Sequence, residues 1–260
     1  MDLIVCLKQV PDLQQIRIKK ETREPVTEGV PLVFGEMDKN ALEEAVKIKE
    51  KSGGTVSVLS IGSLKLRDTI KEALAAGADQ AFLMIDPGYD NLDSGPKVAL
   101  LAAAIRKIGK FDLILLGEGS ADNYSGQTGP RLAQLLGLPL LSYVKQLEPG
   151  SGTIKAVRNM EQYMETVEAS LPAVITVTSG INQPRIPSLM QILRASKKPM
   201  TEFKPADIGV NPEQVNQRQT VIASNLAPVE QRQMVILEGA KEENLDTVVN
   251  ALVKEGVVRS

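Results

Sequence analysis

Histidine is absent from the 260-residue sequence, and cysteine occurs only once, as Cys6. Without an imidazole, Ser-His-Asp and Cys-His catalysis are excluded, and so is every metal site that needs a histidine ligand. A single cysteine cannot form an internal disulfide, a zinc ribbon or an iron–sulfur cluster. We therefore expect no metal site in this protein.

An excess of charge of one sign is also missing, and aromatic side chains are scarce. The 30 lysines and arginines nearly balance the 32 aspartates and glutamates, and only 3% of the residues are aromatic, with no tryptophan. A nucleic-acid backbone is bound by a broad basic surface, and single strands stack on aromatic rings. The composition therefore predicts no nucleic-acid partner.

Long apolar runs are the third absence. No run approaches the roughly 20 residues that span a bilayer, and no basic region precedes the apolar stretch near the N-terminus. We expect no membrane insertion and a cytoplasmic location. With 43% hydrophobic and 24% charged residues, the sequence is typical of a folded protein with one large or two small domains.

Short apolar runs alternate with segments of helical periodicity through the first two-thirds of the chain. We predict strands at 3–7, 55–61, 81–85, 113–116 and 173–177, and helices at 41–49, 66–75, 98–108 and through 132–136. Asp38 is expected to cap the first helix, and Gly77 to end the second. Serial alternation with wholly apolar strands predicts an α/β fold, a doubly wound and mostly parallel sheet with helices on both faces.

Other segments depart from this alternation. Residues 16–18, and 153–157 with 163–168, have a period of two and predict antiparallel ribbons beside the main sheet. Prolines are frequent after Ile181, which favours an extended arm leading to a last strand at 234–237 and an amphipathic helix at 245–252. We divide the chain into an α/β nucleotide-binding domain, 1–190, and a C-terminal arm and helix, 191–260, which we expect to fold against another subunit.

The segment 113–130 carries the clearest sign of a ligand site. An apolar strand ends at Gly117 and leads into a loop of small and polar residues, after which Ser125 or Thr128 is expected to cap a helix. Ligands of open α/β sheets bind beyond the carboxyl ends of the strands, where helix N-termini offer free N–H groups. Glycines at 117, 119, 126 and 129 let the backbone approach a phosphate. The loop predicts a nucleotide or dinucleotide site, and a glycine-rich turn without a ligand is the alternative.

Neighbouring strand ends also have two interpretations each. Asp38 is expected to cap a helix in either case, and its carboxylate can also bond a ribose hydroxyl. Cys6 is an ordinary core residue whose backbone alone would touch a ligand. Ile61 and Gly62 either pass under an adenine or begin a turn. No P-loop motif is present and no G-x-G-x-x-G follows the first strand, which argues against kinases, ordinary ATPases and Rossmann dehydrogenases.

Six stretches of the sequence carry a family resemblance that extends over nearly the whole chain. They are VCLKQVPD at 5–12, DKNALEEA at 38–45, EALAAGAD at 72–79, LPAVITV at 171–177, NQPRIPSL at 182–189 and ASKKP at 195–199. In them the sequence resembles the β subunit of electron-transfer flavoproteins. Residues 161–163 depart from the family pattern, in which an acidic residue is usually followed by glycine, and this affects only a ribbon.

The resemblance implies an adenine nucleotide alpha hydrolase-like fold and a heterodimer with an α subunit that carries its own FAD. In conventional members the β subunit holds AMP without a redox role. In bifurcating members it holds a second FAD, which takes a hydride from NADH and divides the electron pair between two acceptors. The loop at 117–127 and the segment 227–239 resemble the bifurcating, Fix-type branch. No catalytic acid or base is implied, because the chemistry belongs to the cofactor.

From this branch we expect FAD rather than AMP, with NADH as the electron donor. The expected high-potential acceptor is a quinone oxidoreductase or an acyl-CoA dehydrogenase, and the low-potential acceptor is ferredoxin or flavodoxin. Two other functions remain open on the residues alone. One is an adenine-nucleotide sensor without a redox role, and the other is a structural subunit that holds no nucleotide.

Carried over position by position, the resemblance also implies site residues. The expected cofactor-binding residues are Cys6, Asp38, Ile61, Gly62, Gly117, Ser120, Ala121, Asp122, Asn123, Tyr124, Ser125, Gly126, Gln127 and Thr128. The expected partner-binding residues are Pro184, Arg185, Leu189, Ile192, Lys197 and Lys198, with Leu189 as an apolar anchor for a dehydrogenase partner.

Overall fold

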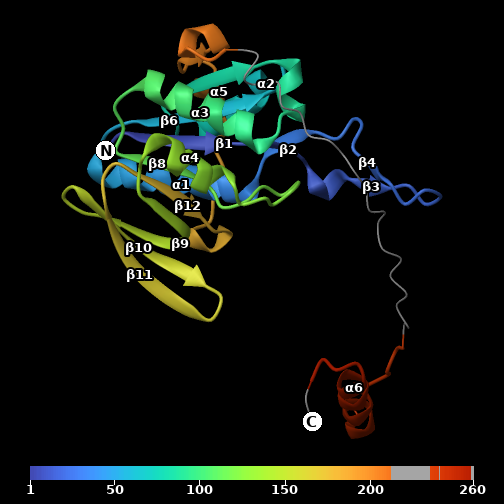
Figure 1. Ribbon diagram of the computed structural model, residues 1–260. Helices are drawn as coiled ribbons and strands as arrows, with labels where there is room; N and C mark the ends of the chain where they lie inside the picture. Colours follow the sequence, from blue (N-terminus) through green and yellow to red (C-terminus); the bar gives the residue numbers. More distant parts are fainter. Residues whose placement is uncertain (212–234, 240, 259–260) are drawn as a thin grey trace.

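The computed structural model describes residues 1–211, 235–239 and 241–258. Its centre is a nine-stranded sheet with the order β11-β10-β9-β12-β8-β1-β6-β7-β13 (Figure 1). The strands are β1 (Leu3–Leu7), β6 (Val56–Gly62), β7 (Gln80–Ile85), β8 (Leu113–Gly117), β9 (Leu140–Pro149), β10 (Thr153–Met160), β11 (Tyr163–Ser170), β12 (Ala173–Val177) and β13 (Met200–Glu202). Only the β9–β10 and β10–β11 pairs in this sheet are antiparallel.

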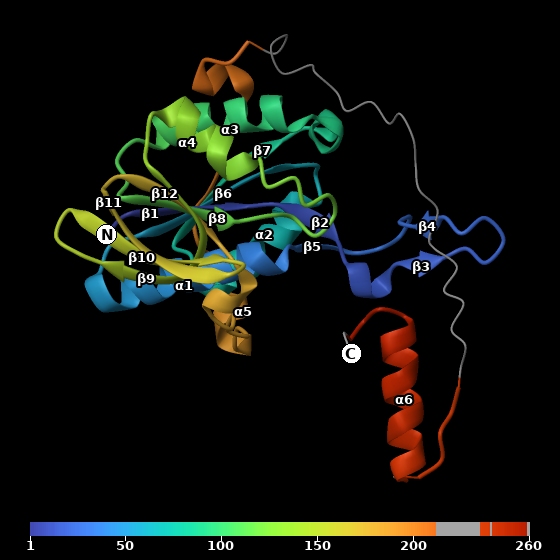
Figure 2. The ribbon, with the colours of Figure 1, turned by 60° about the horizontal axis from the view of Figure 1, so that its bottom comes forward.

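Helices cover both faces of the sheet (Figure 2). One side carries α1 (Glu36–Ser52), α2 (Leu66–Ala76) and α5 (Leu189–Ala195), and the other carries α3 (Ser94–Ile108) and α4 (Thr128–Leu136). Successive side chains of a strand point to opposite faces. Leu3 and Val5 of β1 therefore join the core under α1 and α2, while Ile4 and Cys6 join the core under α3 and α4. The central strands are buried on both faces and mostly apolar, and the predicted doubly wound α/β fold is confirmed.

Shorter elements lie between β1 and α1. β2 (Gln9–Pro11) pairs with β5 (Leu32–Phe34), and β3 (Arg17–Ile18) pairs with β4 (Pro25–Val26), both antiparallel and outside the main sheet. The ribbon β10–β11 is antiparallel as predicted, but it extends the main sheet through β9 instead of standing beside it. Single turns of 3-10 helix occur at Leu13–Gln15, Pro87–Asn91, Ser179–Ile181 and Pro205–Ile208.

The helix α1 begins before Asp38. Gly35 occupies the N-cap position and Asp38 lies within the first turn, so the prediction that Asp38 caps this helix is wrong. The reason is that its carboxylate faces the strand ends and accepts hydrogen bonds from Lys8 and Gly117 there. An acidic group in the first turn still interacts favourably with the helix dipole.

Two further local predictions are wrong. α4 starts after Gln127 without any side-chain cap, so neither Ser125 nor Thr128 has the predicted capping role. The first N–H groups of α4 are thereby left for another acceptor. Residues 235–237 form no strand, because no strand edge of the described chain lies beside them to complete a ladder, and residue 234 lies outside the described residues.

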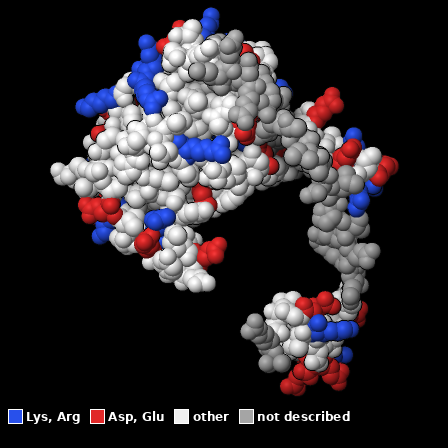
Figure 3. Space-filling view, in the orientation of Figure 1, with Lys and Arg blue, Asp and Glu red and all other residues white. Residues whose placement is uncertain are grey.

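The predicted C-terminal amphipathic helix is present as α6 (Glu242–Lys254), which Figures 1 and 2 show apart from the sheet. Its apolar stripe is uncovered, with Leu245 66% and Val249 53% exposed. Basic and acidic side chains are interspersed on the face drawn in Figure 3, in keeping with the balanced charge of the sequence. Within the described ranges, no helix combines the length and apolarity needed to span a membrane.

Candidate functional site

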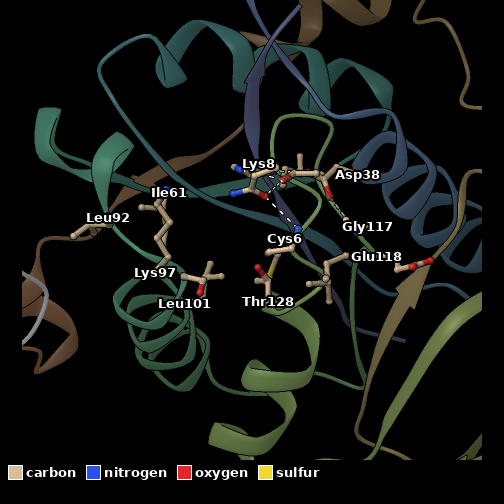
Figure 4. A pocket seen from close by; sticks show the side chains of 18 residues that line it. Cys6, Lys8, Asp38, Ile61, Leu92, Lys97, Leu101, Gly117, Glu118 and Thr128 are labelled. Carbon is tan, nitrogen blue, oxygen red and sulfur yellow. Dashed lines mark hydrogen bonds between the residues drawn. The ribbon is translucent and has the colours of Figure 1, made fainter. Parts of the chain in front are cut away.

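An open pocket lies at the carboxyl ends of β1, β6 and β8 (Figure 4). It is enclosed by these strand ends, the loop before α4, and the start of α3. Its lining residues are Cys6, Leu7, Lys8, Asp38, Ile61, Leu92, Ser94, Lys97, Leu101, Leu116, Gly117, Glu118, Gly119, Ser120, Asn123, Ser125, Gly126 and Thr128. Open α/β sheets bind their ligands at this edge.

Asp38 joins the ends of the two central strands in one wall of the pocket. Its carboxylate accepts the N–H of Lys8 at 2.6 Å and the N–H of Gly117 at 3.1 Å. Only 8% of Asp38 is exposed, and this burial raises its pKa to about 6 against the opposing effect of the two N–H groups. A Cβ at position 117 would lie 2.7 Å from Asp38 Oδ1, so the contact requires glycine at that position.

The side chain of Lys8 connects β1 to the glycine-rich loop. Its Nζ lies 2.6 and 2.7 Å from the two carboxylate oxygens of Asp122 and donates to Ser120 Oγ at 3.1 Å. Partial burial alone would raise the pKa of Asp122, but the hydrogen bonds and the positive charge of Lys8 outweigh it and lower the pKa. Ser120 in turn donates to Asn123 Oδ1 at 2.9 Å, so the loop is held by its own polar groups.

Gly126 and the start of α4 present backbone to the pocket. The φ of Gly126 is +63°, in the left-handed region, and the nearest atom to a Cβ there would be the Glu118 carbonyl oxygen at 4.0 Å. Thr128 begins α4 and also lines the pocket, so an anion bound here would meet free N–H groups and the positive end of the helix dipole.

Gly129 has a different role from the one predicted. A Cβ at this position would collide with Cγ2 of Thr176 on β12. The absence of a side chain at Gly129 therefore lets α4 pack closely on the sheet. The sequence does not distinguish this glycine from Gly126, because both stand in the same small-residue loop.

The wall across from Asp38 and Gly117 is formed by α3 and the turn before it (Figure 4). Leu92, Ser94, Lys97 and Leu101 line it, and the sequence analysis missed all four. It also missed Lys8, although Lys8 directly follows β1 and the strand-end rule applies to it. The sequence contains no pattern that predicts the α3 side chains as pocket residues, because whether they line the pocket depends on how α3 packs across the sheet.

Nine of the fourteen expected cofactor-binding residues line the pocket: Cys6, Asp38, Ile61, Gly117, Ser120, Asn123, Ser125, Gly126 and Thr128. Burial raises the pKa of the Cys6 thiol to about 12, so this thiol stays neutral near pH 7.

The other five are Gly62, Ala121, Asp122, Tyr124 and Gln127. Asp122 touches the pocket only through Lys8, while Ala121 and Gln127 are exposed beside it. Tyr124 is 54% exposed and donates to Glu118 Oε1 at 3.3 Å. Gly62 faces Gln9, whose Oε1 would lie 3.5 Å from a Cβ.

The donor set of the pocket suits an adenine nucleotide. Loop and helix N–H groups can hold phosphate, and the apolar side chains of Ile61, Leu92 and Leu101 can cover a base. The open side left by Gly126 gives a ligand close access to backbone. Across the residues that the structure describes, no cluster of histidine, cysteine, aspartate and glutamate is arranged to hold a metal ion.

A sequence model of the electron transfer flavoprotein domain matches residues 26–208 of the chain. The chain belongs to the electron transfer flavoprotein family.

Similar proteins of the electron transfer flavoprotein family match most or all of its length. The caffeyl-CoA reductase-Etf complex subunit CarD of Acetobacterium woodii is 36% identical over 214 residues, 82% of each chain. The electron transfer flavoprotein subunit beta of Thermoanaerobacterium thermosaccharolyticum is 32% identical over 261 residues, 99% of this chain and 100% of the relative. That of Bacillus subtilis is 32% identical over 259 residues, with the same coverage.

In this electron transfer flavoprotein chain, part of the expected partner-binding loop is open to solvent. Leu189 and Ile192 of α5 are 72% and 53% exposed, Lys197 is exposed, and Pro184 is half-buried. The side chain of Leu189 is therefore open to solvent and is not packed within its own chain. The structure leaves it accessible to a partner.

The remaining two residues of that loop are engaged within the chain. The Arg185 guanidinium lies 2.7 Å from Glu43 and 2.6 Å from Glu50, both on α1. Lys198 Nζ donates to the carbonyl oxygens of Leu74 and Ala78 at the end of α2, at 2.7 and 2.5 Å. These contacts hold the loop against α1 and against the end of α2.

Proposed function

We propose that this chain is the β subunit of a heterodimeric electron transfer flavoprotein, and that its pocket binds FAD. The observation that carries the proposal is the pocket at the ends of β1, β6 and β8, where a glycine-rich loop and the start of α4 present N–H groups. Relatives that match its full length and are named beta subunits support the same assignment. Its partner would be an α subunit, in the cytoplasm.

The residues of the pocket would bind and orient the nucleotide. The N–H groups near Gly126 and Thr128 are suited to the pyrophosphate, and Ile61 is suited to the adenine. Asp38 retains lone pairs, beyond the two N–H bonds it accepts, for a ribose hydroxyl. FAD, when bound, supplies chemistry that links two-electron donors to one-electron acceptors, so no side chain has to act as an acid or a base.

We further propose that the complex performs electron bifurcation. NADH would be the donor, a quinone oxidoreductase or an acyl-CoA dehydrogenase the high-potential acceptor, and ferredoxin or flavodoxin the low-potential acceptor. The resemblance of the loop at 117–127 to the Fix-type branch supports this function. A relative named as a subunit of a caffeyl-CoA reductase-Etf complex adds support.

A conventional β subunit that holds AMP is the second candidate. AMP presents the same adenine, ribose and first phosphate as the adenosine half of FAD, so the lining residues fit both. The segment 227–239 also contributed to the branch resemblance, and its residues 227–234 lie outside the described part of the chain.

Cofactor analysis of the heterodimer separates the candidates. The chain would be co-expressed with the α subunit of the same organism, the complex denatured, and the released FAD and AMP quantified by chromatography. Two FAD and no AMP per heterodimer are expected for a redox flavin in this subunit. One FAD and one AMP would identify the conventional carrier, and one FAD without a second nucleotide would contradict the pocket assignment.

Bifurcation itself is tested by acceptor dependence. Under anaerobic conditions, NADH is expected to reduce ferredoxin or flavodoxin only while a high-potential acceptor is also present. Reduction of the low-potential acceptor without the other acceptor, or no reduction with both, would contradict bifurcation and leave the cofactor assignment unaffected.

A further inference from the structure

Lys97 extends into the pocket from the first turns of α3, across from Asp38 and Gly117 (Figure 4). It is half-buried, and among the described residues its Nζ makes one hydrogen bond at 3.3 Å, to the carbonyl oxygen of Asp90. Within the described ranges, no carboxylate lies within ion-pair distance of this ammonium group. An ammonium group has three donors, and at least two of those of Lys97 are therefore available to a ligand.

Lys8, the other lysine that lines the pocket, already has a carboxylate partner. Lys8 is already neutralised by Asp122, at 2.6 Å, and its ammonium also donates to Ser120. Burial, followed by the positive charge of Lys8, lowers the pKa of Lys97 and outweighs the carboxylates of Asp122, Asp90 and Asp93, which lie beyond ion-pair distance and act in the opposite direction. The pocket therefore contains one paired and one unpaired cation, and a bound anion would relieve the loss of solvation and the repulsion at Lys97.

The charge of Lys97 decides which part of a nucleotide would meet it, because the side chains beside it on the same side of the pocket are apolar. The apolar side chains of Ile61 and Leu101 suit a base, and a neutral base or sugar acceptor leaves the lysine charge uncompensated. A phosphate oxygen supplies both the opposite charge and several acceptors, and charge-assisted hydrogen bonds are about twice as strong as neutral ones.

We infer that Lys97 is a nucleotide-binding residue that pairs with a phosphate group of the ligand, opposite the N–H groups of the loop and α4. This inference rests on the proposed function only in that the pocket holds an adenine nucleotide. It applies equally to the diphosphate of FAD and to the phosphate of AMP.

Isothermal titration calorimetry of the full-length chain, freed of bound nucleotide, tests this inference with ADP and adenosine as probes. Lys97→Gln should raise the Kd of ADP about tenfold and leave the Kd of adenosine within about twofold, because only ADP carries the charge. Lys97→Arg should restore most of the ADP affinity. Lys107→Gln, the same change at an exposed position on α3, is the matched control and should alter neither Kd.

Salt gives a second readout that a merely structural role would not change. ADP binding should weaken less steeply between low and high ionic strength in Lys97→Gln than in the wild type. Equal losses for ADP and adenosine, or no loss for ADP, would overturn the assignment of Lys97 while the nucleotide pocket stands. If the wild type binds neither probe, the pocket of the proposed function fails, and this inference fails with it.

Discussion

At the scale of single residues, Asp38 couples the pocket to protonation. Burial raises its pKa to about 6, above the ordinary value of 3.8. The folded state therefore holds this proton more tightly than the unfolded state, and stability from this group is present at low pH and lost as the pH rises through 6. We expect the loss to be roughly 2 kcal/mol of unfolding free energy between pH 4 and pH 7.

Asp38→Asn removes the titration. The unfolding free energy of the wild type relative to this variant should fall by roughly 2 kcal/mol from pH 4 to pH 7, measured by urea denaturation. Asp246→Asn, at an exposed position on α6, is the control and should show no such trend. A difference between wild type and Asp38→Asn that stays constant across this range would contradict the raised pKa.

Substitutions at Gly126 test whether a phosphate group binds next to this residue. Gly126→Glu and Gly126→Ala both place a side chain at a φ of +63°, which destabilises each by about 1–2 kcal/mol. Only the glutamate adds a negative charge where we expect phosphate. Gly126→Glu should therefore lose its nucleotide while Gly126→Ala keeps most of it, measured as nucleotide released per chain. Full occupancy in the glutamate variant would disprove the phosphate position.

The part of the candidate site that is contiguous in the sequence could be predicted, and the part built from distant segments could not. The loop from Gly117 to Thr128 is contiguous and rich in glycine, and the strand-end rule locates it. The local sequence predicts that Asp38 caps a helix. Its carboxylate instead accepts hydrogen bonds from Lys8 and Gly117, which lie 30 and 79 residues away. Lys97 was invisible, because no local pattern marks a lysine on one helix as facing a strand end on another.

At the scale of elements, the contact between α4 and β12 depends on Gly129. Gly129→Ala should destabilise the fold by about 1–3 kcal/mol, because the added methyl group collides with Cγ2 of Thr176. Thr176→Ser removes that methyl group and keeps the hydroxyl that accepts the N–H of Tyr143. The double variant should therefore recover stability relative to Gly129→Ala in urea unfolding. Additive losses would show that the two positions do not interact.

The alternation of elements was predictable because the buried strands are mostly apolar and the helices carry their apolar residues at helical spacing. Pairing that depends on distant segments was not. The strand β13 has three residues and is defined by its ladder with β7, more than 110 residues earlier. Conversely, the apolar residues 235–237 satisfied a local strand pattern without an available edge. The spacing of apolar residues in the sequence thus indicates which segments are buried. Which strands pair with each other depends on the whole fold.

At the scale of the whole molecule, the described C-terminal elements divide between the body and α6. The domain boundary at residue 190 stays a prediction, and residues just beyond it still contact the body, since β13 pairs with β7 and α5 packs on α2. α6 has no buried residue. An amphipathic helix gains most of its stability by burying its apolar face, which is consistent with a subunit partner.

Hydrogen exchange tests that partnership. We expect the amides of α6 to exchange rapidly in the chain alone and to be protected at least tenfold in the complex with the α subunit, because protection follows burial. The amides of α2, whose Ile70 and Leu74 are fully buried, are the internal control and should be protected in both samples. Strong protection of α6 in the isolated chain would contradict a role in binding the α subunit.

The burial of Cys6 has a practical consequence for following that assembly. Cys6 is the only cysteine in the sequence, is 6% exposed, and keeps a neutral thiol. Labelling reagents react with the thiolate, so the buried and neutral thiol of Cys6 should react very slowly in the folded protein. A cysteine introduced at exposed Asn250, a polar position of α6, would be modified alone. A fluorophore or spin label there can track α6 as subunits meet, without any prior removal of a native thiol.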